Sequence, residues 1–484
     1  MTDYEPVIGL EIHVQLKTRT KMFCGCELSF GDPPNIHTCP TCLGLPGALP
    51  VINARAVDFA VMIGLALGSE IAPRSIFHRK SYFYPDSPKG YQISQYDIPI
   101  CRGGQLDDVR IHRVHLEEDA AKLVHVGESG RIHGSDRSVV DFNRCGTPLV
   151  EVVSEPDLRS ARQAHEWLTL LRVTLRQLGV SDVNMDEGSL RCDANVSIRP
   201  VGSSELGTKT ELKNMNSFRF LERGVDAEIE RQTALARAGA PVVQETLHFD
   251  PGTGRLTPLR SKEEAHDYRY FPEPDLVPLL VTEEMLAAAR AQVPELPAAR
   301  AQRFERELGL HPDRARDLAF RAELADYYEA ALAAAPDGPV TPVEIANWIP
   351  QLVERIRSDA DADPNPADSR VSAAALAALA GMVAAKEVSR DAAREVLTAL
   401  VAGGGDPRAV VEREGLGALS GEDGDGLAAI VDSAIAADPD AAEKLRAGNM
   451  KAIGPLVGYV MRETKGRADG GEVTRLIRER VGVG

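Results

Sequence analysis

The chain has 484 residues, of which 43% are hydrophobic and 26% are charged, and its formal net charge is −17 at pH 7. This acidic balance argues against indiscriminate nucleic-acid binding, which depends on surplus positive charge. No apolar run reaches the roughly 18 residues of a membrane span, and the acidic, alternating N-terminus lacks the pattern of an export signal. The length predicts roughly three domains of about 100–200 residues each, and we expect a cytoplasmic protein.

The composition changes along the chain and predicts an α+β domain followed by two all-α domains. Up to about residue 293 the sequence is rich in the alternation typical of strands, and beyond it alanine, leucine, arginine and glutamate recur at helical spacing. Pro294 and Pro297 mark a linker, an acidic stretch at 358–369 with prolines marks a second break, and the glycines at 403–405 mark a third. We expect the chemistry in the first of three domains: residues 1–293, 294–405 and 406–484.

The first predicted strand covers residues 7–16. Its apolar residues fall on one face, while Glu11, His13 and Gln15 fall on the other. The polar face therefore presents an acid beside an imidazole. Taken alone, this strand could equally have an ordinary solvated face, and His13 could be a hydrogen-bonded core histidine.

Four of the seven cysteines lie in one short window, at Cys24, Cys26, Cys39 and Cys42. Two closely spaced pairs supply the four sulfur ligands of a tetrahedral zinc site. A site closed by four thiolates would be structural, and the alternative is four unrelated reduced cysteines. We expect the other three to be small buried hydrophobic residues: Cys101, Cys145 and Cys192.

Carboxylates recur on later predicted strands, at Glu117, Glu118, Asp119, Glu151, Asp193 and Glu211. Glu151 lies inside the otherwise apolar run PLVEVV, where a carboxylate is costly to bury without a cation or donors. The adjacent acids at 117–119 repel one another, and a bound metal would relieve that repulsion. Lys209 and Lys213 share a face with Glu211.

These strands predict a sheet whose polar face holds divalent ions. Oxygen ligands with few imidazoles suit Mg²⁺, and Mg²⁺ beside lysine and arginine suggests phosphoryl transfer from a nucleotide. The alternative is a polar, solvated sheet surface. The chain contains no GxxxxGK[ST], GxGxxG, GxSxG or HExxH motif, so an ATP site would not be of the P-loop or Rossmann type.

Seven long segments stand in order between residues 7 and 276: VIGLEIHVQL, RKSYFYPDSPKGYQISQYDIPI, HLEEDAAKL, DFNRCGTPLVEVVSEPD, GSLRCDANVSIRP, ELKNMNSF and DYRYFPEPDL. Together they closely resemble the B subunits of the aspartyl/glutamyl-tRNA amidotransferases. The C-terminal stretch GNMKAIGPLVGYVMRETKGRADGGEVTRLI is similar to the tail domain of the same family. The resemblance therefore covers nearly the whole chain.

The resemblance implies a heterotrimer that includes a glutaminase subunit together with a small third subunit. The family uses ATP to phosphorylate the side-chain carboxylate of misacylated Glu-tRNA(Gln) or Asp-tRNA(Asn). Ammonia channelled from the glutaminase then replaces the phosphate. The implied fold is a cradle-shaped N-terminal domain related to glutamine synthetase, followed by a helical domain and a tail domain. The glutaminase signature is missing, so we do not expect this chain to hydrolyse glutamine.

The resemblance also implies site residues. Metal ligands are expected at Glu11, His13, Glu118 and Glu151, with Asp193 and Glu211 as further candidates. Lys80 and Lys213 are candidates for phosphate or carboxylate contacts, or else for surface salt bridges. Tyr82 and Tyr84 either line the acyl pocket or pack in the core. The cysteine quartet resembles a zinc site that some family members carry.

The region 441–484 has nine basic and five acidic residues, which leaves it a local charge of +4. We expect contacts to tRNA phosphates, which position the RNA without reading its sequence, from Lys451, Arg462, Lys465 and Arg467. An ordinary solvated basic helix is the alternative. For the whole chain, the alternative function is a zinc-bearing tRNA-binding scaffold that performs no chemistry.

Overall fold

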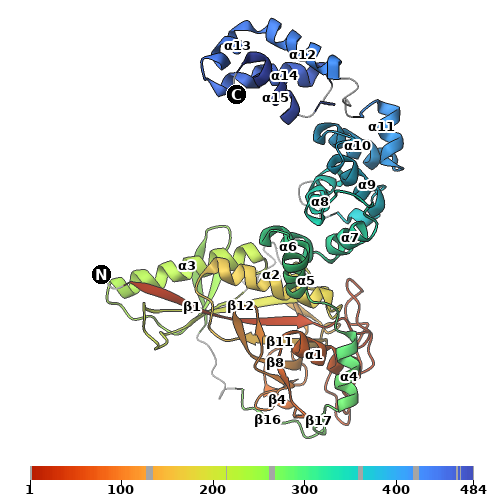
Figure 1. The fold of residues 1–484 in the computed structure, drawn as a ribbon. Helices are drawn as coiled ribbons and strands as arrows, with labels where there is room; N and C mark the ends of the chain where they lie inside the picture. Colours follow the sequence, from red (N-terminus) through yellow and green to blue (C-terminus); the bar gives the residue numbers. More distant parts are fainter. Residues whose placement is uncertain are drawn as a thin grey trace. The chain divides into compact units, whose positions relative to one another are not determined.

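The computed structural model describes residues 3–126, 135–213, 215–260, 268–357, 364–417, 424–464, 467–468 and 470–482. The chain divides into two compact units, Met1–Leu296 and Pro297–Gly484. The first unit is rich in strands and the second is helical (Figure 1), which confirms the mixed class predicted from the sequence. Among the described residues, no helix is both long and apolar enough to cross a membrane.

The first unit is built on a sheet in which the described residues form ten strands. All its pairs are antiparallel except β13 with β14. From edge to edge the order is β15 (Arg255–Arg260), β14 (Thr246–Asp250), β13 (Thr210–Lys213), β12 (Leu190–Pro200), β1 (Tyr4–Gln15), β11 (Pro148–Ser154), β8 (Val109–Glu118), β6 (Cys101–Arg102) and β2 (Glu70–Ile71), and β7 (Gln105–Leu106) also pairs with β8. The first predicted strand is thus a central one.

Three smaller sheets complete the strands of this unit. They are β16 (Phe271–Pro272), β4 (His78–Ser81) and β5 (Tyr91–Ser94); β9 (Lys122–Val126) with β10 (Arg137–Asp141); and β3 (Arg74–Ser75) with β17 (Leu279–Leu280). The pairings of β16 and β17 bring residues 271–280 beside residues 74–81.

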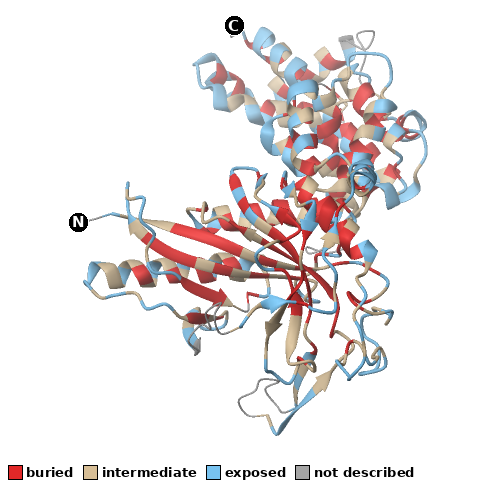
Figure 2. Cartoon of the chain, turned by 90° about the horizontal axis from the view of Figure 1, so that it is seen from below, coloured by how far each residue is buried: buried red, intermediate tan, exposed pale blue. Residues whose placement is uncertain are grey.

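One face of the large sheet carries the core of this unit. Ile8, Leu10, Ile12 and Val14 of β1 are fully buried, and Figure 2 shows buried residues running along the strands. The helices α2 (Ala161–Gln177) and α3 (Phe218–Arg237) lie side by side, with α3 against β12 (Figure 1). This packing removes the apolar residues of the strands from water and leaves their polar residues on the other face.

The helices α1 (Ala54–Ala66) and α4 (Glu283–Gln292) pack on each other. Gly64 lets α1 approach β6 closely, because a Cβ at this position would lie 2.4 Å from the sulfur of Cys101. A larger residue would therefore push the helix away from the sheet.

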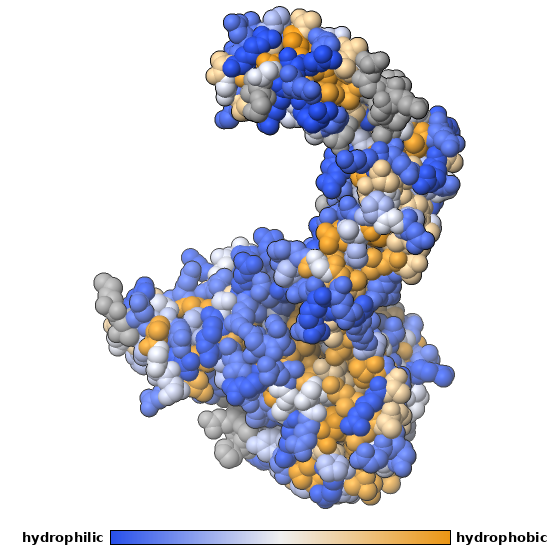
Figure 3. All heavy atoms as spheres, viewed as in Figure 1, coloured by the Kyte–Doolittle hydropathy of each residue, from blue (hydrophilic) through white to orange (hydrophobic). Residues whose placement is uncertain are grey.

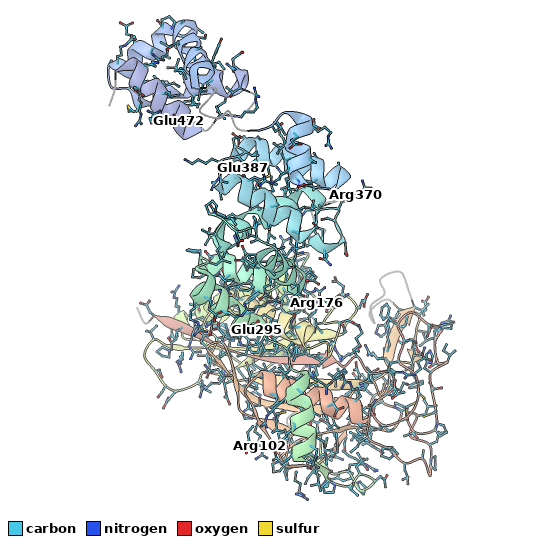
Figure 4. The ribbon with its side chains drawn as sticks, turned by 45° about the vertical axis from the view of Figure 1, so that its right-hand side comes forward. Arg102, Arg176, Glu295, Arg370, Glu387 and Glu472 are labelled. Carbon is cyan, nitrogen blue, oxygen red and sulfur yellow. The ribbon has the colours of Figure 1, made fainter. Side chains whose placement is uncertain are left out.

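The second unit consists of helices. They are α5 (Pro297–Leu308), α6 (Pro312–Ala319), α7 (Ala322–Ala333), α8 (Pro342–Ile356), α9 (Ala373–Ala384), α10 (Arg390–Gly403), α11 (Pro407–Glu414), α12 (Gly424–Ala437), α13 (Pro439–Arg446), α14 (Ile453–Glu463) and α15 (Gly470–Val481), with short 3-10 turns at Pro366–Asp368 and Met450–Ala452. A capping box between Thr341 and Glu344 starts α8. Glu387, labelled in Figure 4, forms an ion pair with Arg408 of α11.

The described helices of this unit form two separate hydrophobic cores, one from α5–α11 and one from α12–α15. Val410 and Val411 of α11 belong to the first core. The predicted border after residue 405 therefore falls inside the first helical core, and the cores separate between Leu416 and Leu427.

Candidate functional site

A row of ionisable side chains crosses four neighbouring strands on the polar face of the large sheet. His13 on β1 lies directly opposite Glu151 on β11 and Arg191 on β12. Glu151 in turn lies opposite His115 on β8. Residues directly opposite one another in a sheet point to the same face, so the strand register gathers these four side chains.

His13, Glu117 and Glu151 form a compact group that we name the first cluster. His13 Nε2 lies 3.6 Å from Glu117 Oε1 and 3.7 Å from Glu151 Oε2. One ligand atom from each of the three residues lies within 4.8 Å of the other two. His115 Nε2 also lies 3.1 Å from Glu151 Oε2. Two carboxylates and an imidazole at this spacing could bind one cation together.

Glu151 of the first cluster and the neighbouring Lys80 keep their charges although burial opposes them. Burial favours the neutral form of Glu151, but His115, His13 and Lys80 outweigh burial and hold its pKa well below the usual value. Burial likewise opposes the charge of Lys80, whereas Glu117, Tyr270 and Glu151 raise the pKa of Lys80 above its usual value. The Glu151 carboxylate is therefore ionised, and the Lys80 ammonium is protonated.

A second cluster, which we define as Glu11, Asp193 and Glu211, lies on the same face. Glu11 is directly opposite Asp193 and accepts a hydrogen bond from Asn195 Nδ2 at 2.9 Å. Lys213 Nζ lies 3.0 Å from Asp193 Oδ2 and 3.5 Å from Glu211 Oε1. Burial opposes the charge of Lys213, but Asp193 and Glu211 raise its pKa above the usual value.

Glu118 lies apart from both clusters, although the family resemblance implied that it is a metal ligand. Consecutive residues of a strand point to opposite faces, so Glu118 and Glu117 cannot both lie beside His13. Glu118 instead pairs with the buried Lys89 and accepts the backbone N–H of Ile93 at 2.9 Å. The sequence signal for Glu117 was its spacing of two from His115, which places both on one face.

Lys80, predicted to contact phosphate or carboxylate, lies on β4 beside aromatic rings. Its Nζ is 4.7 Å from the ring centre of Tyr268. Burial raises the pKa of nearby Tyr270 to about 12, so that phenol stays neutral. Tyr82 and Tyr84 stack on each other with ring centres 5.4 Å apart, and their role in an acyl pocket stays a prediction.

The sulfur atoms of the cysteine quartet lie within 4.8 Å of one another: Cys24, Cys26, Cys39 and Cys42. Hydrogen bonds from the Cys24 thiol and the Cys39 backbone N–H, assisted by the nearby Lys21 ammonium, lower the pKa of Cys42, whereas the bond to Cys42 raises the pKa of Cys24. Thiolate is the form that binds metals, so this arrangement fits a four-sulfur metal site. The other three cysteines are buried, as predicted: Cys101, Cys145 and Cys192.

Lys21 connects the cysteine quartet to the rest of the first unit through hydrogen bonds. Its side chain is fully buried, and Nζ donates to the carbonyl oxygens of His37 at 2.7 Å and Phe142 at 3.1 Å. Nζ also lies 3.7 Å from Cys42 Sγ. Sequence reasoning missed Lys21, because an isolated lysine gives no signal that it is buried.

The predicted tRNA contacts lie around α14. Lys451 and Arg462 are exposed, and Arg467 is partly buried, with Nε donating to the carbonyl of Thr464 at 3.1 Å. Lys465 lies outside the described residues. The structure thus places two of the four cations where RNA could reach them.

Comparisons with known proteins cover the whole chain. Residues 6–287 match the family described as the GatB/GatE catalytic domain, and residues 326–481 match the GatB domain. The B subunit of the aspartyl/glutamyl-tRNA(Asn/Gln) amidotransferase of Anaeromyxobacter dehalogenans is 49% identical over 490 residues, which is 100% of this chain and 99% of the relative. The protein of the same name from Frankia casuarinae is 49% identical, with 99% and 96% covered. That from Geobacter sulfurreducens is 47% identical, with 99% of each covered.

We expect Lys21→Met to lower the free energy of unfolding by about 2–6 kcal/mol, because two partly buried carbonyl groups lose their donor at about 1–3 kcal/mol each. Urea unfolding followed by circular dichroism measures this loss. Lys17→Met is the matched control: Lys17 is mostly exposed and pairs with Asp182, so its removal should change stability by less than about 1 kcal/mol. Equal effects of the two substitutions would contradict the anchoring role of Lys21.

Proposed function

This chain belongs to the family of aspartyl/glutamyl-tRNA(Asn/Gln) amidotransferase B subunits, and we propose that it carries out the ATP-dependent amidation step. The full-length matches confirm the resemblance that the sequence motifs predicted. The observation that carries the proposal is the first cluster, whose buried Glu151 stays ionised beside two histidines and a lysine. A scaffold that only binds tRNA would have no use for such a group, so the scaffold alternative is not favoured.

The proposed reaction turns a carboxylate on a misacylated tRNA into an amide. An oxygen of the side-chain carboxylate of Glu-tRNA(Gln) or Asp-tRNA(Asn) bonds to the γ-phosphorus of ATP. The bond from that phosphorus to the β-phosphate oxygen breaks, and ADP leaves with the electron pair. Ammonia then attacks the acyl carbon, phosphate leaves, and the nitrogen loses a proton. The acyl phosphate is needed because oxide itself is a very poor leaving group.

We propose that both clusters bind Mg²⁺; the ligand atoms of the first cluster already lie within 4.8 Å of one another, whereas those of the second cluster are spread more widely. Their donors are carboxylate oxygens with one imidazole, which suits a hard cation that prefers oxygen. The first cluster would hold one ion and the second cluster another. Bound Mg²⁺ would neutralise charge on the transferring phosphoryl group. Lys80 and Lys213 would contact phosphate or carboxylate oxygens beside the two clusters, and Glu117 replaces Glu118 in the proposed ligand set.

The cysteine quartet would hold a structural zinc ion. Four thiols lie close enough together to bind one ion, and such a site leaves no position open for catalysis. We propose further that the fold of the first unit is related to that of glutamine synthetase and that the protein is cytoplasmic.

The proposed partners in the heterotrimer are a glutaminase subunit, which supplies ammonia, together with a small third subunit. Figure 3 shows apolar side chains exposed on the first unit. Among its exposed apolar residues are Phe271, Val277 and Leu280, of which Val277 is 79% exposed. An exposed apolar patch such as the one in Figure 3 is typical of protein contacts. The tail would bind tRNA through Lys451, Arg462, Lys465 and Arg467.

We expect Glu151→Gln to lower the rate of amide formation by about 100-fold or more, because the first cluster loses a charged ligand. The assay contains the complex with the glutaminase and small subunits, misacylated Glu-tRNA(Gln), ATP, Mg²⁺ and ammonium chloride, which bypasses the glutaminase. Glu155→Gln is the control, since Glu155 is half-exposed and pairs with His112, and it should retain nearly full activity. Unchanged amidation by Glu151→Gln with bound tRNA would favour the scaffold, and Asp-tRNA(Asn) serves as the second substrate.

We expect the purified chain to contain about one equivalent of zinc and Cys39→Ser to lose most of it, because one of four thiolate ligands is removed. Zinc is measured by inductively coupled plasma mass spectrometry. Cys192→Ala should keep its zinc, since Cys192 is buried in β12, away from the quartet. Equal zinc content in all three proteins would rule out the quartet as the zinc site.

We expect Lys451→Gln with Arg462→Gln to weaken tRNA binding about tenfold and to reduce the slope of log K against log salt by about 1–2, since each phosphate contact contributes roughly one ion. Filter binding across a salt series measures both quantities. Arg475→Gln is the control, because Arg475 already pairs with Glu472 and Glu479. An unchanged slope in the double variant would show that the tail does not bind phosphates.

A further inference from the structure

Arg191 occupies a central position on the polar face of the sheet. It lies directly opposite His13 of the first cluster and two residues before Asp193 of the second cluster on the same strand. Its side chain is 41% exposed, whereas that of Glu117 is 6% exposed. The guanidinium therefore lies beside both clusters and remains accessible to a ligand on this face.

A buried carboxylate fixes the orientation of Arg191. Arg191 Nη2 donates to Asp119 Oδ2 at 2.8 Å, and Gln15 Nε2 donates to the same oxygen at 2.9 Å. Asp119 is 4% exposed, and Arg144 Nε lies 3.7 Å from the same oxygen, so two guanidinium groups surround this carboxylate. The ion pair is thus formed from two charged groups, and one edge of the guanidinium is held in place.

With the residues that the structure describes, the guanidinium forms no hydrogen bond other than the one to Asp119. Arg191 Nε is buried and has no hydrogen-bond partner among the described residues. A guanidinium has five N–H donors, and a buried donor without a partner requires an explanation. An arginine guanidinium is not deprotonated in proteins, so Arg191 is a permanent cation directly opposite His13 and two residues from Asp193.

The positive charge of Arg191 beside the two clusters favours the binding of an anion. If the clusters hold Mg²⁺, as proposed above, the metal ions and Arg191 repel one another unless an anion lies between them. The anion that the proposed reaction brings to this face is the transferring phosphoryl group. Arginine matches phosphate oxygens with several parallel donors.

We propose that Arg191 is a catalytic residue that donates hydrogen bonds to the oxygens of the phosphoryl group as it moves from ATP to the substrate carboxylate, with Asp119 as its positioning residue. This inference rests on the proposed function. Arg191 keeps its proton throughout, so it stabilises negative charge on the phosphoryl oxygens and takes no part in proton transfer.

The test compares Arg191→Ala, Arg191→Lys and Asp119→Asn in the complex with the glutaminase and small subunits, using the ammonium-driven amidation at varied ATP. We expect Arg191→Ala to lower kcat by about 100-fold or more, and Arg191→Lys to recover only part of this, because an ammonium cannot reproduce the guanidinium geometry. We expect Asp119→Asn to lower kcat by about tenfold. Guanidinium chloride at millimolar concentration should raise the rate of Arg191→Ala and leave the wild-type rate unchanged.

Arg199→Ala is the matched control. Arg199 lies on the same strand and the same face, but it pairs with Glu5 at 2.6 Å, and its loss should leave kcat within about twofold of wild type. A kcat of Arg191→Ala within twofold of wild type would overturn the inference while leaving the proposed function standing. A large loss without guanidinium rescue, accompanied by a lower thermal midpoint, would show a purely structural ion pair and would also overturn it. If wild-type complex makes no ATP-dependent amide from either tRNA, the proposed function and this inference fall together.

Discussion

The buried negative charge of Glu151 is the constraint on which the first unit depends. A carboxylate taken out of water loses several kcal/mol of hydration unless neighbouring charges and donors replace it. Here the replacement comes from His13, His115 and Lys80, which lie on β1, β8 and β4. β1 and β8 both pair with β11, which carries Glu151, whereas β4 belongs to a separate three-stranded sheet. The charge is therefore compensated only when β1 and β8 pair with β11 in this register and β4 brings Lys80 close to them. A slip of one residue on β1 would turn His13 to the opposite face and remove one of the three groups that stabilise the charge of Glu151.

The strand register has a different energetic effect on each face of the sheet. On one face, Leu10 and Ile12 are fully buried, and the burial of apolar area stabilises the pairing. On the other face, the two clusters bring like charges together, which is unfavourable without cations. The apolar face therefore supplies the stability that holds the polar face in an arrangement it would not adopt by itself. This explains why side chains with mutual repulsion can remain preorganised for binding.

The sequence predicts those features that depend on neighbours along the chain. The alternation around Glu11 and His13 identifies a half-buried strand, and the spacing of the cysteines identifies a four-sulfur group. Features that depend on pairing between distant strands are less accessible. Whether Glu117 or Glu118 shares a face with Glu151 depends on which residue of β8 lies opposite Glu151. Once His115 is known to lie there, the spacing of two residues places Glu117 on the same face. The hydrogen bond from Arg191 to Asp119 joins residues 72 positions apart, and no local sequence pattern predicts it.

The carboxylates of the two clusters and the lysines beside them also constrain how ligands can bind. Lys213 pairs with Asp193, and the charge of Lys80 is balanced by Glu117 and Glu151. A carboxylate that turns its oxygens to a metal ion interacts less with its lysine, and the lysine then needs another anion. In the proposed reaction, phosphate groups would provide that anion, so metal ions and phosphate would each strengthen the binding of the other. Such mutual strengthening is a coupling free energy, and it acts equally in both directions. The clusters would therefore fill together with ATP, because neither the metal ions nor the phosphates satisfy all the charges alone.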